Sequence, residues 1–299
     1  MRRHVVVILN PVSGRGDMSA AVQAVRRRLE RAGCACDIAV TDAAGHATVM
    51  TANLAADVEA VLVAGGDGTV CEVANGLVGR NIPIAILRTG TENLVAREFR
   101  MPTRAHRVAD TLLHGEPVAC DVGVANDRRF LAVAGVGFDA ECVMRLSQNR
   151  QGHITHLDYF WPIWRTFWSH RFPELTVEVD GAVVFQGPGL AMIGNIARYS
   201  AGLRILARAR RDDGLLDVCV FRCSSRRTLL RHAAYAFVRC HIGRAGVMYT
   251  QGRSVRVTAQ IEVLIEIDGD LGGCLPLSCS VLPRAAAFLR PIRRWREKG

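Results

Sequence analysis

Three glycines around one carboxylate, Gly65-Gly-Asp-Gly-Thr69, follow the apolar run Ala60–Ala64. Glycines allow the backbone to turn sharply and to approach a ligand closely. The residues that follow, Thr69 to Leu77, have a helical pattern, so backbone N–H groups at a helix start can meet a phosphate. Because like charges repel, Asp67 suits a Mg²⁺–phosphate complex or an orienting hydrogen bond better than direct phosphate contact. The stretch predicts a nucleotide site, with an ordinary strand-to-helix turn as the alternative.

Two further loops also leave short apolar runs. Asn10-Pro-Val-Ser-Gly14, with Arg15 behind it, follows Val5–Leu9, and Arg88-Thr-Gly-Thr-Glu-Asn93 follows Ile84–Leu87. The first loop lacks the third glycine of GxGxxG and the GK[ST] of a P-loop. Arg15 is either a phosphate partner or a solvated side chain. Three such loops, rich in Gly, Thr, Ser and Asn, predict one polar floor for a nucleotide.

Short apolar runs and helical segments alternate up to about residue 120, and they must position these loops. Continuous apolar strands between helices indicate a parallel sheet covered on both faces. Ligands of such sheets bind beyond the carboxyl ends of the strands, where the loops lie. We expect strands at Val5–Leu9, Ile38–Thr41, Ala60–Ala64 and Pro83–Leu87, and helices at Ser19–Ala32, His46–Leu54, Val70–Leu77, Asn93–Phe99 and Arg104–His114.

The second part of the chain has a different period. Apolar residues occupy every second position from Val255 to Ile267, which predicts one long antiparallel strand with a buried face. Asp180-Gly181 between two apolar runs predicts a hairpin. We infer a β-rich second domain, with further strands at 118–125, 130–136, 189–195 and 215–222 and a helix at Leu229–Arg239.

Composition narrows the classes of protein. The 299 residues fit one large domain or two medium ones, and the net charge of +10 is carried almost wholly by arginine. Lys298 is the only lysine, which excludes a P-loop lysine and a Schiff-base lysine in the body of the protein. The preferred explanation of the arginine excess is genomic composition. The alternative is attraction to anionic lipid headgroups, nucleotides or nucleic acid.

Ten cysteines without a CxxC pair predict buried free thiols in a reducing compartment. With no 18-residue apolar stretch, we expect a cytoplasmic protein that touches the membrane only from that side.

Motifs along nearly the whole chain carry a family resemblance. Together they resemble the diacylglycerol kinase catalytic family in its bacterial lipid kinase branch, related to sphingosine kinases and similar in fold to NAD kinase. The motifs are Asn10-Pro-x-Ser-Gly14, Gly45-His-Ala47, Gly65–Thr69 with Glu72, Asn75 and Gly76, Gly90-Thr-x-Asn93, Phe130–Asp139, Ile193-Gly-Asn195, Asp212–Asp217 and Ile267–Asp270.

The resemblance implies an α/β domain plus an all-β domain. The first would hold a Rossmann-like parallel sheet with helices on both faces, and the second an antiparallel β-sandwich, with the active site in the interdomain cleft. We expect the nucleotide-binding domain at residues 1–121, which residues 281–299 can rejoin, and the lipid-substrate domain at 122–280.

The resemblance also implies an activity in phospholipid metabolism. Family members transfer the γ-phosphoryl group of ATP to a lipid hydroxyl, of diacylglycerol or a similar lipid, with Mg²⁺. The implied partners are ATP and a lipid at a membrane surface, without nucleic acid, and a homodimer stays open. The positions that match the family's ATP contacts are Asn10, Pro11, Val12, Ser13, Gly14, Thr41, Gly65, Gly66, Asp67, Gly68, Thr69, Val70, Cys71 and Thr91.

Asp268-Gly-Asp270 is the candidate for proton transfer. A lipid hydroxyl is a poor nucleophile at neutral pH, and a carboxylate within hydrogen-bond reach can accept its proton. The family's usual motif is Asp-Gly-Glu, so the shorter Asp270 leaves open which acid is the base. We assign Asp270 by position, with Asp268 as the close competitor and a plain hairpin turn as the alternative.

Candidate metal contacts come from two places. Asp67 is expected to bind the catalytic Mg²⁺ through water, and Glu72 and Asp121 are candidates to extend that network. Arg88 or Arg15 could offset phosphate charge. Leu94 stands where the family often has Asp, which removes one polar contact near the phosphates or the metal.

The segment 210–215 resembles a structural Mg²⁺ turn of relatives. Its ligands would be the side chain of Asp213 and the backbone carbonyls of Arg210 and Leu215. Hard cations accept such oxygens, but the neighbouring arginines oppose cation binding. A plain turn is the alternative.

The aromatic segment Tyr159–Trp168 holds three of the four tryptophans. Interfacial aromatics with basic neighbours suit a protein that reaches a lipid in a bilayer. The alternative, slightly favoured, is a helix buried against the β domain.

Two other functions remain open at this point. A kinase of a soluble substrate such as NAD would share the fold and the GGDGT loop. A non-catalytic homologue that binds nucleotide and membrane would keep the loops without turnover; intact Asp67, Asp268 and Asp270 argue against it.

Overall fold

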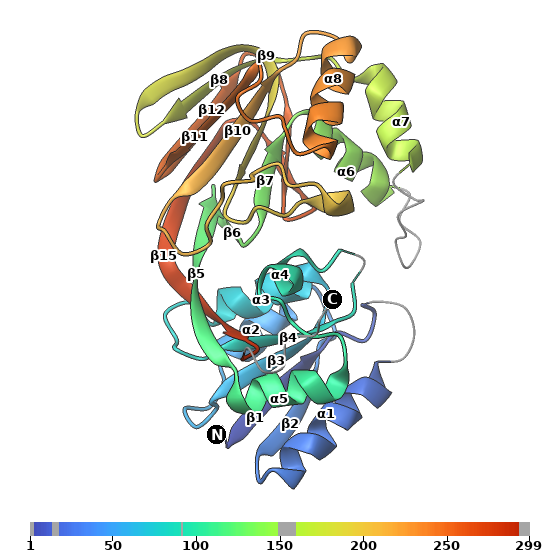
Figure 1. The fold of residues 1–299 in the computed structure, drawn as a ribbon, viewed down its shortest axis with the longest axis vertical. Helices are drawn as coiled ribbons and strands as arrows, with labels where there is room; N and C mark the ends of the chain where they lie inside the picture. Colours follow the sequence, from blue (N-terminus) through green and yellow to red (C-terminus); the bar gives the residue numbers. More distant parts are fainter. Residues whose placement is uncertain (1–2, 14–17, 91, 149–159, 293–299) are drawn as a thin grey trace. The chain divides into compact units, whose positions relative to one another are not determined.

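The computed structural model describes residues 3–13, 18–90, 92–148 and 160–292, which divide into two compact units (Figure 1). One unit comprises Met1–Cys120 and Arg284–Gly299, and the other comprises Asp121–Pro283. Both boundaries fall inside long strands, β5 (Glu116–Ala125) and β15 (Leu277–Arg290).

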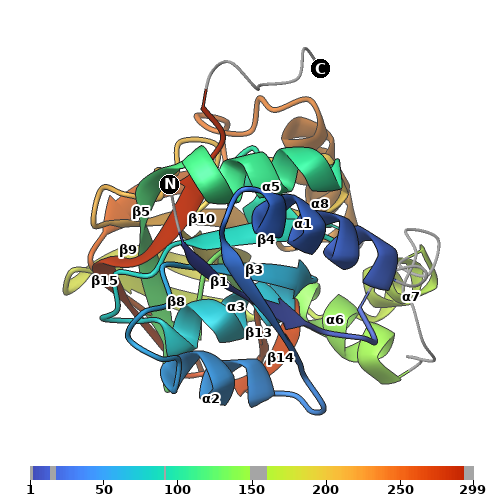
Figure 2. The same ribbon diagram turned by 90° about the horizontal axis from the view of Figure 1, so that it is seen from below.

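The first unit is built on the expected parallel sheet, with strand order β4-β3-β1-β2. The end of β15 joins it in parallel, with Phe288 opposite Ile84. Figure 2 shows α1 and α5 on one face and α2 and α3 on the other, so the sheet is covered on both faces and its strands are continuously apolar. The elements are β1 (His4–Leu9), α1 (Ser19–Arg31), β2 (Ala35–Val40), α2 (His46–Ala52), β3 (Ala60–Gly65), α3 (Asp67–Gly76), β4 (Ile84–Arg88), α4 (Leu94–Glu98) and α5 (Ala105–His114).

The second unit is an antiparallel β-sandwich with helices, as expected. One set of strands runs in the order β14-β13-β7-β9-β8-β12-β15, while β10 pairs with β9 and β11. Its core contains Val177, Val218, Val257 and Ile265. The elements are β6 (Arg128–Phe130), β7 (Val133–Val136), α6 (Phe138–Gln148), α7 (Phe160–Ser169), β8 (Glu174–Val179), β9 (Ala182–Gly194), a 3₁₀ turn (Ser200–Gly202), β10 (Leu216–Arg222), α8 (Arg226–Phe237), β11 (Val247–Gly252), β12 (Ser254–Ala259), β13 (Leu264–Ile267) and β14 (Asp270–Cys274).

The two predictions from short-range pattern in this unit had different outcomes. The hairpin at Asp180-Gly181 is confirmed, because both residues have positive φ and Val179 pairs with Ala182. The single long strand from Val255 to Ile267 is wrong. It is two strands, β12 and β13, which pair with different neighbours. The alternating pattern does not reveal the break between the two strands, because the apolar residue there, Ile261, continues the pattern. In the structure Ile261 is 58% exposed.

Helix α7 corrects the slightly favoured prediction of a buried aromatic helix. Thr166 is buried, but the side chains of Trp161, Trp164 and Trp168 are exposed. Tyr159 lies outside the described residues. The helix therefore buries one face and presents its tryptophans on the other.

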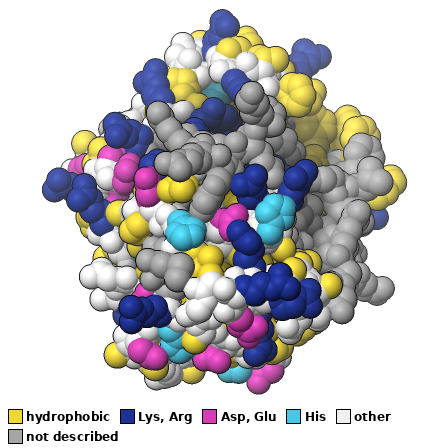
Figure 3. All heavy atoms as spheres, turned by 60° about the horizontal axis from the view of Figure 1, so that its bottom comes forward, with side chains coloured by type: hydrophobic (Ala, Val, Ile, Leu, Met, Phe, Trp, Pro, Cys, Tyr) yellow, Lys and Arg dark blue, Asp and Glu magenta, His cyan; other side chains and the backbone are white. Residues whose placement is uncertain are grey.

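The surface and the thiols agree with the composition. Figure 3 shows arginine side chains spread over one face of the molecule with carboxylates between them. All ten cysteines are free thiols, and most of them are buried. In the part of the chain that the structure describes, no helix has the length and apolar character needed to cross a bilayer.

Candidate active site

Two side-chain hydrogen bonds join the three predicted loops at the carboxyl edge of the parallel sheet. Asn10, after β1, donates from Nδ2 to Oγ1 of Thr69 in the first turn of α3, at 2.9 Å. Oγ of Ser13 lies 2.9 Å from Oγ1 of Thr89, after β4. Because β1, β3 and β4 are neighbours in the sheet, their ends bring polar side chains from three loops together.

Glycine is required where these loops touch. A Cβ on Gly90 would lie 3.0 Å from Cα of Gly66, and a Cβ on Gly65 would lie 2.6 Å from Cβ of Thr69. A Cβ on Gly68 would meet nothing within 4 Å. The first two glycines allow backbone to pack on its neighbours, whereas Gly68 leaves open space at the start of α3.

The carboxylate of Asp67 accepts two backbone hydrogen bonds, from Leu94 N to Oδ2 at 3.0 Å and from Val95 N to Oδ1 at 3.1 Å. Leu94 therefore contacts Asp67 through its backbone N–H group, and this contact does not depend on the side chain at position 94. A carboxylate oxygen carries more than one lone pair, so an oxygen that accepts from a backbone N–H group can also accept from a metal-bound water. The donor set fits the water-mediated Mg²⁺ contact expected of Asp67.

The other predicted nucleotide contacts fall into several environments. Thr41 is buried at the end of β2, where its N–H donates to Leu9 O at 2.9 Å. Val12 is exposed, while the side chain of Val70 is buried in the core and can offer only its backbone. Cys71 is half-buried. Pro11 belongs to the exposed first loop; Gly14, Arg15 and Thr91 lie outside the described residues.

Two residues predicted for the phosphate and metal network make hydrogen bonds within the fold. Glu72 accepts hydrogen bonds from Gly45 N at 2.9 Å and Ala47 N at 3.2 Å, which fixes the start of α2. Arg88 donates to the backbone carbonyl of Met101 and holds the chain beyond α4. Their roles toward metal and phosphate stay predictions.

In the second unit, Asp268 and Gly269 form the two-residue turn between β13 and β14. Both have positive φ, 51° and 86°, and Ile267 pairs with Asp270 across the turn. The hairpin alternative is therefore correct for the backbone. The Asp268 carboxylate is bound by three backbone N–H groups, those of residues 131, 132 and 133, at 2.8 to 2.9 Å.

Asp270 differs from Asp268 in its surroundings. Its side chain is 62% exposed, and its nearest described cation is Nη2 of Arg128 at 3.8 Å. Nη1 of Arg128 donates to Leu271 O at 2.7 Å, so the guanidinium is fixed beside the turn. A carboxylate that is open to solvent can accept a proton from a substrate hydroxyl that comes within hydrogen-bond reach.

A buried acid pair lies next to this turn, and the sequence did not single it out. Oε2 of Glu266 accepts a hydrogen bond from Gly269 N at 2.8 Å, so Glu266 holds the middle of the turn. A Cβ on Gly135 would lie 2.7 Å from Oε1 of Glu266 and 2.8 Å from Oδ2 of Asp139, which places both oxygens beside Gly135. Burial raises the pKa of both carboxyls, and the charge of Asp139 raises the pKa of Glu266 further. Alternation assigns Glu266 to the exposed face, but α6 packs against β13 and covers it.

The segment 210–215 is a turn held by protein groups. Oδ2 of the fully buried Asp121 accepts from Gly214 N at 2.6 Å, and Asp121 N donates to Arg211 O at 2.7 Å. Oδ1 of Asp213 accepts from Leu215 N at 3.1 Å. Across residues 3–13, 18–90, 92–148 and 160–292, no group of three His, Cys, Asp or Glu has metal-binding geometry. The structural Mg²⁺ at Arg210, Asp213 and Leu215 stays a prediction.

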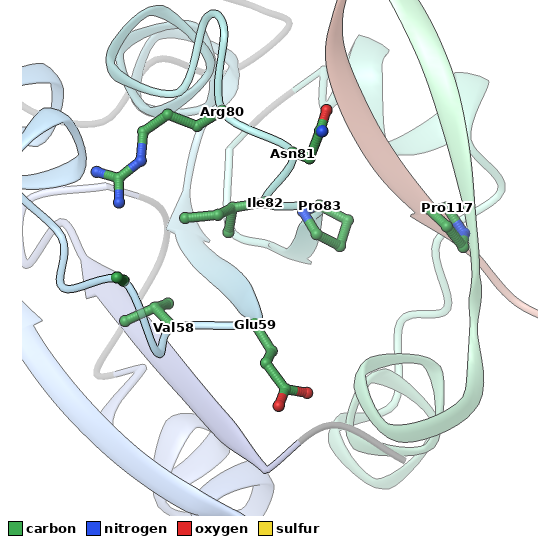
Figure 4. Close-up of a pocket in the computed structure, with 8 residues that line it drawn as sticks. Val58, Glu59, Arg80, Asn81, Ile82, Pro83 and Pro117 are labelled. Carbon is green, nitrogen blue, oxygen red and sulfur yellow. The ribbon is translucent and has the colours of Figure 1, made fainter.

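A separate pocket of about 640 Å³ lies in the first unit, where the chain enters β3 and β4 (Figure 4). Its two charged residues are engaged by the fold. Arg80 donates to the carbonyls of Thr51, Ala52 and Leu54, and Glu59 accepts from Arg3 N at 3.1 Å. The pocket is at the amino ends of these strands, whereas the glycine loops follow their carboxyl ends.

Comparison with protein families supports both halves of the sequence interpretation. Residues 4–125 match the family model of the diacylglycerol kinase catalytic domain. Residues 132–290 match the model of the YegS C-terminal NAD kinase beta sandwich-like domain.

Individual relatives cover nearly the full chain. A diacylglycerol kinase of Mycobacterium tuberculosis is 31% identical, with 97% of each chain covered. A diacylglycerol kinase of Bacillus subtilis is 28% identical, with 90% of each chain covered. A solved structure from Bacillus anthracis str. Sterne has a TM-score of 0.78 at 23% identity and covers 97% of each chain, which shows the shared fold.

Proposed function

We propose that this chain, which belongs to the diacylglycerol kinase family, is an ATP-dependent lipid kinase that phosphorylates the hydroxyl of diacylglycerol or a similar lipid. The observation that carries the proposal is the three-loop floor, joined by the Asn10–Thr69 and Ser13–Thr89 hydrogen bonds. Such a floor offers backbone N–H groups at glycines and at a helix start, together with hydroxyl groups. Phosphate oxygens accept hydrogen bonds from all of these groups.

The floor binds ATP in this proposal. The first loop, Thr41, the stretch Gly65–Cys71 and Thr91 supply backbone and hydroxyl contacts to the nucleotide. Bound Mg²⁺ would neutralise charge on the phosphates, and Asp67 would hold it through water. Residues 1–121, with 281–299, form the nucleotide domain, and 122–280 form the lipid domain, acting from the cytoplasmic side of a membrane. The interdomain position of the active site stays a prediction.

Asp270 is the proposed base. As the lipid oxygen bonds to the γ-phosphorus and the bond from that phosphorus to the β-bridging oxygen breaks, the hydroxyl proton passes to the Asp270 carboxylate and ADP leaves. Asp268 positions the turn, because its carboxylate is already bound by three backbone N–H groups. Glu266 supports it through Gly269 N.

A product screen tests the proposal. The protein is incubated with Mg²⁺-ATP and a total lipid extract, or with NAD, and new phosphorylated species are identified by mass spectrometry. We expect a phosphorylated lipid and no NADP. Formation of NADP would favour the soluble-substrate kinase, and ATP binding without any product would favour a non-catalytic homologue.

A further inference from the structure

Helix α7 carries an exposed aromatic face. Trp161, Trp164 and Trp168 follow the i, i+3, i+7 spacing of one helix face, and with Ile163 they are 45% to 64% exposed. The Trp164 and Trp168 rings lie edge to face at 5.7 Å. Tryptophan side chains favour the boundary between acyl chains and headgroups of a bilayer.

Helix α8 adds a second exposed apolar stripe. Leu230, Phe237 and Val238 are 57% to 76% exposed and follow the i, i+7, i+8 spacing of one face. The helix begins at a capping box of Ser225 and Thr228 and buries its other side through Leu229 and His232. Its stripe therefore faces outward.

The two helices are joined at their ends and lie near each other in the second unit (Figure 1). Arg226, the first residue of α8, donates from Nε to Phe167 O at 3.0 Å and lies over the Trp168 ring at 5.4 Å. These contacts place the start of α8 beside the end of α7. We call the exposed faces of the two helices together the α7/α8 face.

Charge on the α7/α8 face has one sign. Arg165 on α7 and Arg226, Arg227 and Arg231 on α8 are exposed, and neither helix contains Asp or Glu. Arginines beside exposed tryptophans complement anionic headgroups. A second copy docked through the same face would bring arginines against arginines, so charge disfavours that occupant.

We propose that the α7/α8 face docks on an anionic bilayer, with the tryptophans and Phe237 at the acyl boundary and the arginines at the headgroups. The ten residues of α7 are too few to span a bilayer, so the helix would lie in its interface. The inference rests on the proposed function, because a lipid kinase must reach a substrate within a membrane. Membrane binding can nevertheless be measured without turnover.

The first test is co-sedimentation of the full chain with vesicles of phosphatidylcholine, with and without phosphatidylglycerol. We expect binding to anionic vesicles, weakened about tenfold or more in Trp161→Ser/Trp164→Ser. Val183→Ser/Ile261→Ser is the matched control, because these side chains are equally exposed at 59% and 58% in the same unit. Equal binding by wild type and the tryptophan variant, or no binding by wild type, would overturn the proposal.

The second test concerns charge. Arg227→Gln/Arg231→Gln should weaken binding to phosphatidylglycerol vesicles about tenfold, since each arginine near an anionic surface contributes favourably. Arg27→Gln/Arg31→Gln removes an equally spaced exposed pair from α1 in the other unit and should leave binding unchanged. An equal loss in both pairs would show non-specific attraction and reject the α7/α8 face.

Phosphoryl transfer to a short-chain, water-soluble diacylglycerol separates the inference from the proposed function. Docking is supported if Trp161→Ser/Trp164→Ser still phosphorylates the water-soluble substrate but no longer phosphorylates diacylglycerol in vesicles. Vesicle binding that depends on the tryptophans but comes without transfer to any lipid would keep the docking face and reject the kinase. If light scattering shows a dimer that the tryptophan variant abolishes, and vesicles are not bound, a second copy is the occupant and docking is rejected.

Discussion

The glycine loop of the first unit and the Asp-Gly-Asp turn of the second both contain an acid bound by backbone N–H groups. Asp67 accepts from Leu94 and Val95 at the start of α4, and Asp268 accepts from three N–H groups ahead of and within β7. Only the second motif places another acid, Asp270, beside the bound one and exposes it. Under the proposed function, the acid that shapes the second motif, Asp268, and the acid that reacts, Asp270, are therefore different residues.

Replacing Asp270 gives the largest expected effect on activity. Asp270→Asn keeps the size of the side chain but removes the base, so kcat should fall by about 10² to 10⁴-fold. The exposed position predicts a change in unfolding free energy within about 0.5 kcal/mol. Steady-state kinetics and urea unfolding measure the two quantities. If this variant turns over at the wild-type rate, Asp270 is not the base and Asp268 becomes the candidate.

Replacing Asp268 should act first on stability. Asn would turn an NH₂ group toward backbone N–H donors and leave buried donors unsatisfied, which costs about 1 to 3 kcal/mol. Urea unfolding with Asp270→Asn as the control measures this difference. If Asp268→Asn unfolds like wild type yet is inactive, the assignment of the two acids is reversed.

Two glycines of the Gly65–Thr69 loop test its packing. Gly65→Ala places a Cβ 2.6 Å from Cβ of Thr69 and should lower the unfolding free energy by about 1 to 3 kcal/mol. Gly68→Ala meets open space inside α3 and should stabilise the fold by about 0.5 to 1 kcal/mol. Thermal unfolding compares the two variants. Equal stabilities would contradict the close contact of the loop with α3.

The buried acid pair predicts the smallest effect, a change in the pH dependence of stability. Burial and Asp139 hold the pKa of Glu266 above its ordinary value of 4.5, with Tyr199 and Asp268 as the other titratable groups that influence this pair. The folded state therefore binds more protons than the unfolded state above that pH, and stability falls as pH rises toward the raised pKa.

Glu266→Gln removes this proton while an amide oxygen can still accept from Gly269 N. Urea unfolding from about pH 5 to about pH 8 should show a shallower decline in the variant than in wild type. Glu262→Gln, at an exposed position between β12 and β13, is the control and should decline like wild type. Parallel curves for wild type and Glu266→Gln would mean that Glu266 is ionised in the folded protein.

The sequence predicts the features that depend on neighbours in the chain. The parallel strands, the helices between them and the Asp180-Gly181 hairpin are visible in apolar period and turn residues. The clamp on Asp268 is not, because its donors lie about 136 residues away and are backbone groups of any residue type. The burial of Glu266 depends on α6, and the exposure of Trp161 depends on which face of α7 packs against the rest of the unit.

Transfer of label from γ-³²P-ATP to diacylglycerol in anionic vesicles, with Mg²⁺ and the full chain, tests the central claim most directly. Chromatography of the extracted lipids separates the phosphorylated product from its substrate. The account predicts labelled phosphatidic acid from wild type and a rate lower by about 10²-fold or more from Asp270→Asn. Label that appears only in inorganic phosphate or in a water-soluble acceptor, with none in lipid, would contradict it.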